Sequence, residues 1–88
     1  MIPAHIKNDL DNYRDGNHPY EFGSFVTAVL ANDLVGAVSR ADSTNIKLLP
    51  EYAEYLRTLP RDMWGSYEIV EREILKQREF LNGRGTDV

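Results

Sequence analysis

The chain has 88 residues, of which 42% are hydrophobic and 27% are charged, a balance typical of a soluble globular domain. A chain of this length forms one domain at most with one small core, which excludes two-domain enzymes, a full dinucleotide-binding sheet and a TIM barrel. Fourteen acidic and ten basic residues give a net charge of −4, which argues against non-specific binding to duplex nucleic acid, because that requires a basic face.

The chain contains no cysteine, so we expect no disulfide scaffold, no thiolate metal site and no cysteine nucleophile. No apolar run approaches the roughly 20 residues that span a bilayer. The first residues also lack the basic and apolar regions of a secretory signal. We therefore expect a cytoplasmic protein without a membrane partner.

The first predicted helix covers about residues 3–15, where apolar side chains recur at helical spacing. Pro3 suits a first helical turn because the N–H that it lacks would have no partner there. Gly16 is expected to end the helix in a left-handed conformation. The segment 16–23 is rich in turn-forming residues and predicts a loop. A short strand over 20–25 is the alternative, but it is too brief to build a sheet.

Residues 24–38 are apolar on nearly every side, which is typical of a central helix, and Ser24 is expected to cap its start. Asn32 and Asp33 interrupt this pattern. Either the segment is one long helix with a polar notch, or Asn32 ends one helix and Asp33 caps a second. We prefer two helices, because Asn and Asp favour caps over helix interiors. The same polar pair could instead form the floor of a ligand site or a subunit contact.

A further cap cluster, residues 42–45, precedes a helix that is expected to kink or restart near Pro50 and to end by Pro60. The connector 60–66 then leads to a last helix, which is capped by Ser66.

The last helix is predicted to stop at Gly83, with residues 84–88 as a frayed tail. The predicted fold class is therefore all-α, a small single-domain bundle of four to six short helices over residues 1–83.

No motif for catalysis or metal binding is complete. An EF-hand read from Asp11 fails because Tyr13 and Phe22 stand where ligands are required. The two histidines, His5 and His18, share no ligand spacing. No nucleophile elbow, phosphate-binding loop or paired carboxylate arrangement is present. We expect no cofactor, no metal and no enzymatic activity.

Six residues are candidates for binding. Three are aromatic residues in predicted connectors, where they either cover the ends of the bundle or form a recognition surface with Arg57 and Arg61, which are nearby in the sequence. The only tryptophan has two possible environments, packed over the bundle end or exposed beside an arginine. Arg40 and Asp42 follow the central apolar stretch. They either bond to helix ends or form the buried polar floor of a ligand site or subunit contact. The six residues are Tyr20, Phe22, Arg40, Asp42, Arg61 and Trp64.

Several short segments occur in a characteristic order: Gly23-Ser24-Phe25, Asn32-Asp33-Leu34, Arg40-Ala41-Asp42 and Trp64-Gly65-Ser66. Over about residues 2–70 this order resembles a group of small phage and prophage proteins of unassigned function. The resemblance implies a phage origin and action inside a bacterial host cell. It implies no activity.

Two classes of function are expected. The first is a phage-encoded, non-enzymatic binding protein that acts on a host component, against host defence; its target would be a host protein or a small nucleotide signal. The alternative is a structural or assembly accessory that forms a helical homo-oligomer without a ligand. An acidic mimic of nucleic acid is weakly supported by a net charge of −4. Because apolar side chains over residues 26–38 exceed what one short bundle covers, we expect a homo-oligomer, with a symmetric dimer as the first candidate.

Overall fold

The computed structural model describes the backbone of residues 1–86 and the side chains of residues 1–82. Within this part of the chain all regular structure is helical, which confirms the predicted small all-α bundle. The elements in order are α1 (Ala4–Arg14), α2 (Ser24–Leu30), α3 (Leu34–Arg40), α4 (Ser43–Ile46), α5 (Leu49–Leu56), the 3-10 helix η1 (Arg61–Met63) and α6 (Tyr67–Thr86).

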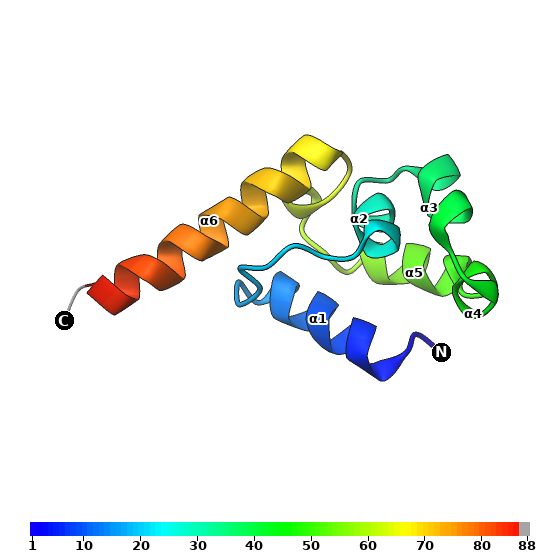
Figure 1. Ribbon diagram of the computed structural model, residues 1–88, viewed down its shortest axis with the longest axis horizontal. Helices are drawn as coiled ribbons and strands as arrows, with labels where there is room; N and C mark the ends of the chain where they lie inside the picture. The colour runs from blue at the N-terminus through cyan, green and yellow to red at the C-terminus, as the bar shows by residue number, and fades with distance from the viewer. Residues whose placement is uncertain (87–88) are drawn as a thin grey trace.

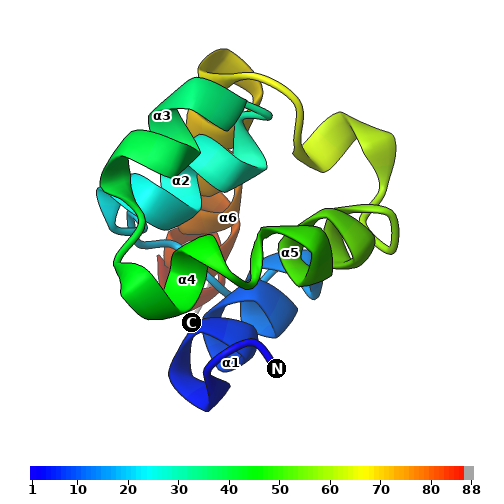
Figure 2. The same ribbon diagram turned by 90° about the vertical axis from the view of Figure 1, so that its right-hand side faces the viewer.

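Five short helices form a body, and α6 leaves it as a long arm (Figure 1). The principal extents of 46 × 25 × 20 Å reflect this arm. Seen from the end opposite the arm, α2 and α3 lie above α4 and α5, and α1 lies below them (Figure 2). The first half of α6 packs against α2 and η1, Gln77 and Arg78 bond to the α1 end and the loop that follows it, and the far end of the helix projects from the body.

The core lies where α1, α2, α5 and the first half of α6 meet. Its two largest fully buried side chains are tyrosines, and each phenol finds an acceptor, as a buried hydroxyl requires. The Tyr13 hydroxyl donates to the Met63 carbonyl at 2.7 Å, which joins α1 to η1. The Tyr52 hydroxyl donates to Asn45 Oδ1 at 2.8 Å, which joins α5 to α4.

The central apolar segment is two helices, as preferred from the sequence. Asn32 has a φ of +60°, a left-handed conformation that Asn tolerates better than most residues. Asp33 then caps α3, accepting from the Gly36 N–H at 2.9 Å. Asp42 caps α4 in the same way, and Ser66 Oγ accepts from the Ile69 N–H at 3.1 Å. These caps are confirmed.

Two predicted boundaries are wrong. Ser24 is the first residue of α2 and not its cap; Gly23 occupies the cap position, and Thr27 Oγ1 donates to the Gly23 carbonyl at 2.9 Å. Gly83 does not end the last helix, because α6 continues to Thr86. One glycine inside a helix costs only about 1 kcal/mol relative to alanine, so it need not stop one. Of the predicted tail, residues 87–88 lie outside the described residues.

Candidate functional site

The polar notch at Asp33 is a structural junction. Its Oδ1 caps α3, and its Oδ2 accepts from the Tyr67 hydroxyl of α6 at 2.5 Å. These two hydrogen bonds, first that from Tyr67 and then that from Gly36, hold the pKa of the Asp33 carboxyl below its usual value. Because both oxygens already have donors, the arrangement favours a helix-joining role for Asp33 over the floor of a ligand site.

Arg40 and Asp42 lie at the end of α3 and the start of α4. The Arg40 guanidinium donates to the Gly36 carbonyl at 3.2 Å, one turn back on its own helix. Asp42 Oδ1 accepts from the Asn45 N–H at 2.7 Å as the cap of α4. Asp42 therefore bonds to a helix end, as expected for a structural role, whereas Arg40 bonds to a carbonyl within its own helix and not to a helix end or a carboxylate.

Tyr20 and Phe22 lie in the loop between α1 and α2, around the buried His18. The rings of Phe22 and His18 stack in parallel with centroids 4.2 Å apart, and Tyr20 meets His18 edge-on at 6.0 Å. Tyr20 is 70% exposed, whereas Phe22 packs against the core. The buried Gln77 of α6 accepts from the His18 N–H at 2.8 Å and fixes this loop to the arm.

Trp64 combines its two expected environments. It packs against the core on one side, and the Arg61 guanidinium lies 4.2 Å from the ring centroid. Arg61 also donates to the Trp64 carbonyl at 2.7 Å. The following residue, Gly65, has a φ of +122°, which only glycine adopts readily, and its N–H donates to the Leu30 carbonyl at 2.7 Å.

The six sequence-predicted residues thus fall into three separate places. Within the described side chains, no hydrogen bond, ion pair or ring contact joins one place to another. The structure does not assemble them into one site.

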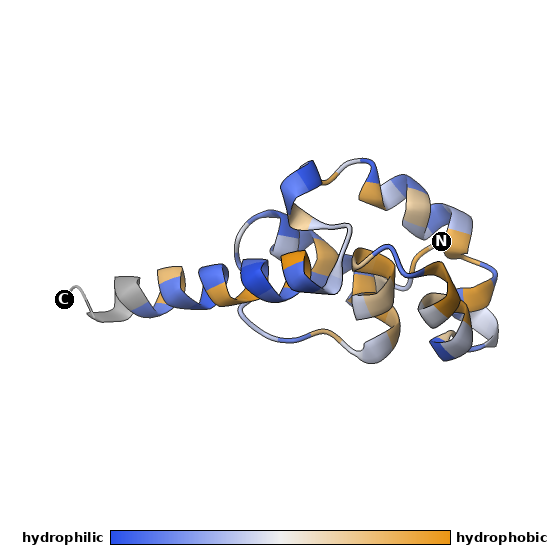
Figure 3. Ribbon diagram, turned by 90° about the horizontal axis from the view of Figure 1, so that it is seen from above, coloured by the Kyte–Doolittle hydropathy of each residue, from blue (hydrophilic) through white to orange (hydrophobic). Residues whose placement is uncertain are grey.

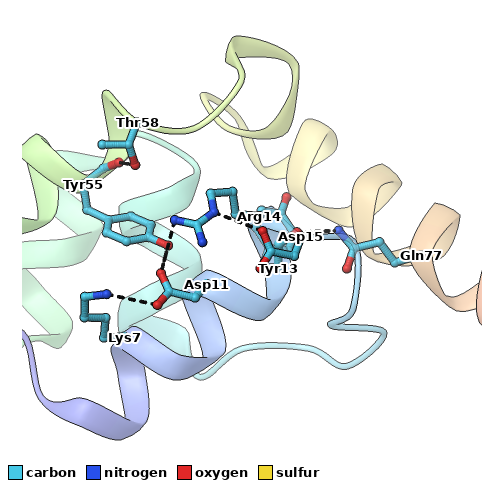
Figure 4. Close-up of polar contacts among 8 residues, drawn as sticks. All are labelled: Lys7, Asp11, Tyr13, Arg14, Asp15, Tyr55, Thr58 and Gln77. Carbon is cyan, nitrogen blue, oxygen red and sulfur yellow. Dashed lines mark hydrogen bonds and ion pairs between the residues drawn. The ribbon is translucent and has the colours of Figure 1, made fainter.

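A polar cluster that the sequence did not predict joins α1 to α5 (Figure 4). Asp11 accepts from the Tyr55 hydroxyl at 2.5 Å and from Lys7 Nζ at 3.0 Å, and Arg14 Nη1 lies 3.5 Å from its Oδ1. The Tyr55 bond, followed by that from Lys7, lowers the pKa of Asp11. Burial, then the bond to Asp11, raises the pKa of Tyr55. With both carboxylate oxygens bonded, this cluster acts as a clamp between helices. Across residues 1–82 no group of three potential ligands could hold a metal ion.

The most distinctive surface is the outer face of α3. The structure places Val26, Val29 and Leu30 of the central apolar segment in the core. It leaves Leu34 69% exposed and Val35 76% exposed, and Val38 is 45% exposed. Ile46 of α4 is exposed too, at 38%. Hydrophobic colouring at the end of the molecule opposite the arm is visible in Figure 3. We call Leu34, Val35, Val38 and Ile46 the α3 face.

A small apolar cavity adjoins the α3 face. It lies between α2, α3 and α5 and has a volume of about 100 Å³. Leu34 belongs both to its lining and to the α3 face. Ala37, Leu49 and Leu56 also line it, and Asn32 and Asp33 of the polar notch contribute its polar part. The sequence signal for this surface was the surplus of apolar residues over 26–38, but the side of the helix that would remain uncovered depends on tertiary packing.

No helix of the described chain has both the length and the apolar character needed to cross a membrane. In comparisons with models of protein families, with curated proteins and with solved structures, the chain matches none.

Proposed function

We propose that this protein is a phage-encoded, non-enzymatic binding protein, and that it holds a protein of the bacterial host on its α3 face. An inhibitor of a host defence protein is the form of this function that we favour. The sequence resemblance to small phage proteins supports the origin. The exposed aliphatic side chains of α3 are the observation that carries the binding role.

Three aliphatic side chains exposed on a helix of seven residues mark an interaction surface, because soluble domains rarely leave contiguous apolar patches uncovered. From Ser24 to Ser39 the only charged residue is Asp33. In the sequence, charged residues flank the α3 face at Asp33, Arg40, Asp42 and Lys47. An aliphatic surface with charges at its edges suits a protein interface, whose centre is depleted of charged residues and whose rim is polar.

The adjoining cavity supports one anchoring contact. Apolar cavities of about 150 Å³ take a benzene molecule, so the cavity of about 100 Å³ suits a smaller group. We infer that a branched aliphatic side chain of the partner occupies it, as buried anchors do at the centres of interfaces.

A nucleotide signal, the other target expected from the sequence, has less support. Phosphate recognition relies on convergent basic side chains or free N–H groups. Arg40 and Arg61 lie in separate places and bond to carbonyls. The first turn of α3 is also occupied by the Asp33 carboxylate.

The test compares two variants that each add one carboxylate to an exposed helical position, Val35→Glu on the α3 face and Asn8→Glu on α1. Host proteins captured from bacterial lysate by the wild type are identified and purified, and their affinities are measured by calorimetry. We expect Asn8→Glu to bind as the wild type does and Val35→Glu to lose at least tenfold in affinity.

Two results would contradict this function. One is a purified partner that binds Val35→Glu as tightly as the wild type. The other is a thermal shift with cyclic or ADP-ribose-type nucleotides that Val35→Glu leaves intact, with no protein partner bound. Circular dichroism of both variants checks that α3 is still folded.

A further inference from the structure

The arm carries a groove beside its packed half. Its volume is about 390 Å³, and its far wall is formed by Glu21, Phe22 and Thr27. The α6 side chains along it include Tyr67, Glu71, Leu75 and Arg78. Leu75 is 45% exposed there and Tyr67 is 47% exposed, so this flank of α6 is incompletely covered.

The spacing of these α6 residues is that of one helical stripe. Glu71 precedes Leu75 by four positions, and Arg78 follows it by three. When two such helices lie antiparallel about a two-fold axis, each position before the axis meets a position after it on the other copy. With the axis near Leu75, Glu71 (four positions before it) lies within one residue rise of Arg78 (three positions after it) on the other copy.

The charges of the two residues are available for this pairing. Among the described residues, Glu71 forms no ion pair. Arg78 uses Nε to donate to the Pro19 carbonyl at 3.1 Å, which leaves the outer guanidinium nitrogens for a second acceptor. Within one chain, seven helical positions separate the residues by roughly 10 Å, too far for a direct pair.

The arm's length fits the same arrangement. Arg78 of α6 still contacts the body through the Pro19 carbonyl, and the helix continues eight positions further, to Thr86. A projecting helical end gains little stability by itself in water. The segment from Leu75 to Thr86 spans roughly 16 Å, enough to lie along the groove beside Tyr67–Leu75 of another copy.

We propose that two copies of the chain associate through α6, antiparallel about a two-fold axis near Leu75, so that the outer part of each arm lies along the groove of the other. Leu75 packs on Leu75 of the second copy, and two reciprocal Glu71–Arg78 ion pairs flank this contact. The interface uses a different surface from the α3 face and stands independently of the proposed function. It would place the interface of the expected homo-oligomer on α6, and not on the apolar segment 26–38 that led us to expect it.

The arm's charge distribution has a single-chain explanation that the test must separate. Acidic residues early in a helix and basic residues late in it also complement the helix dipole. An interaction with the helix dipole acts within one chain. If it were the only role of these charges, mixing two charge-reversal variants would not restore a dimer that each variant alone had lost.

The experiment uses two charge reversals in the full chain, Glu71→Arg and Arg78→Glu. Each alone places like charges at both pairs of the interface, and we expect the dimer mass, twice 10.1 kDa, to fall to that of a monomer in light scattering. When the two variants are mixed, both pairs become opposite in charge again, and we expect a heterodimer to form.

Glu54 and Arg57 of α5 provide a control. They are opposite in charge, are exposed, and do not line the groove. Glu54→Arg and Arg57→Glu should both remain dimeric. Because the chain has no cysteine, Leu75→Cys adds a unique thiol. Mild oxidation should cross-link it into a covalent dimer, whereas Glu79→Cys should stay largely unlinked.

A wild-type protein that remains monomeric at high micromolar concentration would overturn the proposal. So would a dimer that survives Glu71→Arg, or single variants that fail to pair when mixed. If Arg78→Glu loses helix content because its bond to Pro19 is broken, Glu71→Arg and the Leu75→Cys cross-link still decide. A dimer broken by Val35→Glu and not by Glu71→Arg would place the interface on α3 instead.

Discussion

Both carboxylate oxygens of Asp33 are bonded to donors from different helices, Gly36 of α3 and Tyr67 of α6. Gly36 lies directly beneath this carboxylate. A Cβ at position 36 would overlap the Asp33 side chain and would approach Arg40 Nη1 to 2.7 Å. The absence of a side chain at Gly36 therefore leaves the space in which the cap and the bond to α6 form together.

We predict that Gly36→Ala lowers the free energy of unfolding by about 1–3 kcal/mol, the usual cost of overpacking, although alanine is the better helix former. Urea denaturation measures this change. Gly23→Ala is the control, because a Cβ there meets nothing within 4 Å. In an Asp33→Ala background the overlap with the carboxylate is removed, and only the end of the flexible Arg40 side chain must move, so Gly36→Ala should become neutral or stabilising. Equal losses in both backgrounds would contradict this explanation.

At the scale of the elements, helices and caps were predictable because their signals are local. Apolar spacing located the helices, and Asp33, Asp42 and Ser66 lie within three positions of the N–H groups that they cap. The ends that depend on tertiary packing were not predictable. Gly83 is a typical stop, yet α6 continues past it.

The contacts that join elements could not be predicted from the sequence. Asp11 and Tyr55 are 44 positions apart, and His18 and Gln77 are 59 positions apart. Nothing in a local pattern says which helices will be neighbours. For the same reason, the six candidate residues could be named but not placed, and α3 could be predicted without showing which of its sides stays exposed.

The η1 connector gives a prediction at this scale. Arg61 covers the ring of Trp64 and bonds to its carbonyl. Arg61→Ala should cost about 0.5–1 kcal/mol for the cation–π contact, and the Trp64 emission maximum should move toward that of a solvated indole. Arg57→Ala is the control, because Arg57 pairs with Glu54 on the surface of α5. An unchanged emission maximum in Arg61→Ala would show that the guanidinium does not cover the ring in solution.

For the whole molecule, the tyrosine–aspartate bonds predict how stability depends on pH. Hydrogen bonds from tyrosine hydroxyls lower the pKa of Asp11 and of Asp33. Aspartate in an unfolded chain titrates near pH 3.9. The stabilisation is therefore present above about pH 4 and is lost as the pH falls through the lowered native values.

The alkaline side has the opposite sign. Burial raises the pKa of Tyr13 and of Tyr55. Because unfolded tyrosine titrates near pH 10, their contribution is complete below about pH 10 and is lost above it. Urea denaturation across the pH range should show both losses. Tyr55→Phe should reduce both losses, since it removes a half-buried phenol and a donor to Asp11. Tyr20→Phe, at an exposed ring, should reduce neither. A Tyr55→Phe curve parallel to that of the wild type would contradict the assignment.

The hydrogen bond from the His18 N–H to Gln77 has a consequence for amide hydrogen exchange. Loop amides usually exchange within moments, because local opening is frequent. The His18 amide is bonded to the side chain of a buried residue on α6, so it should exchange only when the loop and α6 separate. We expect its protection factor to match those of core helical amides and to collapse in Gln77→Ala. One backbone proton in the α1–α2 loop would then report whether the arm is seated on the body.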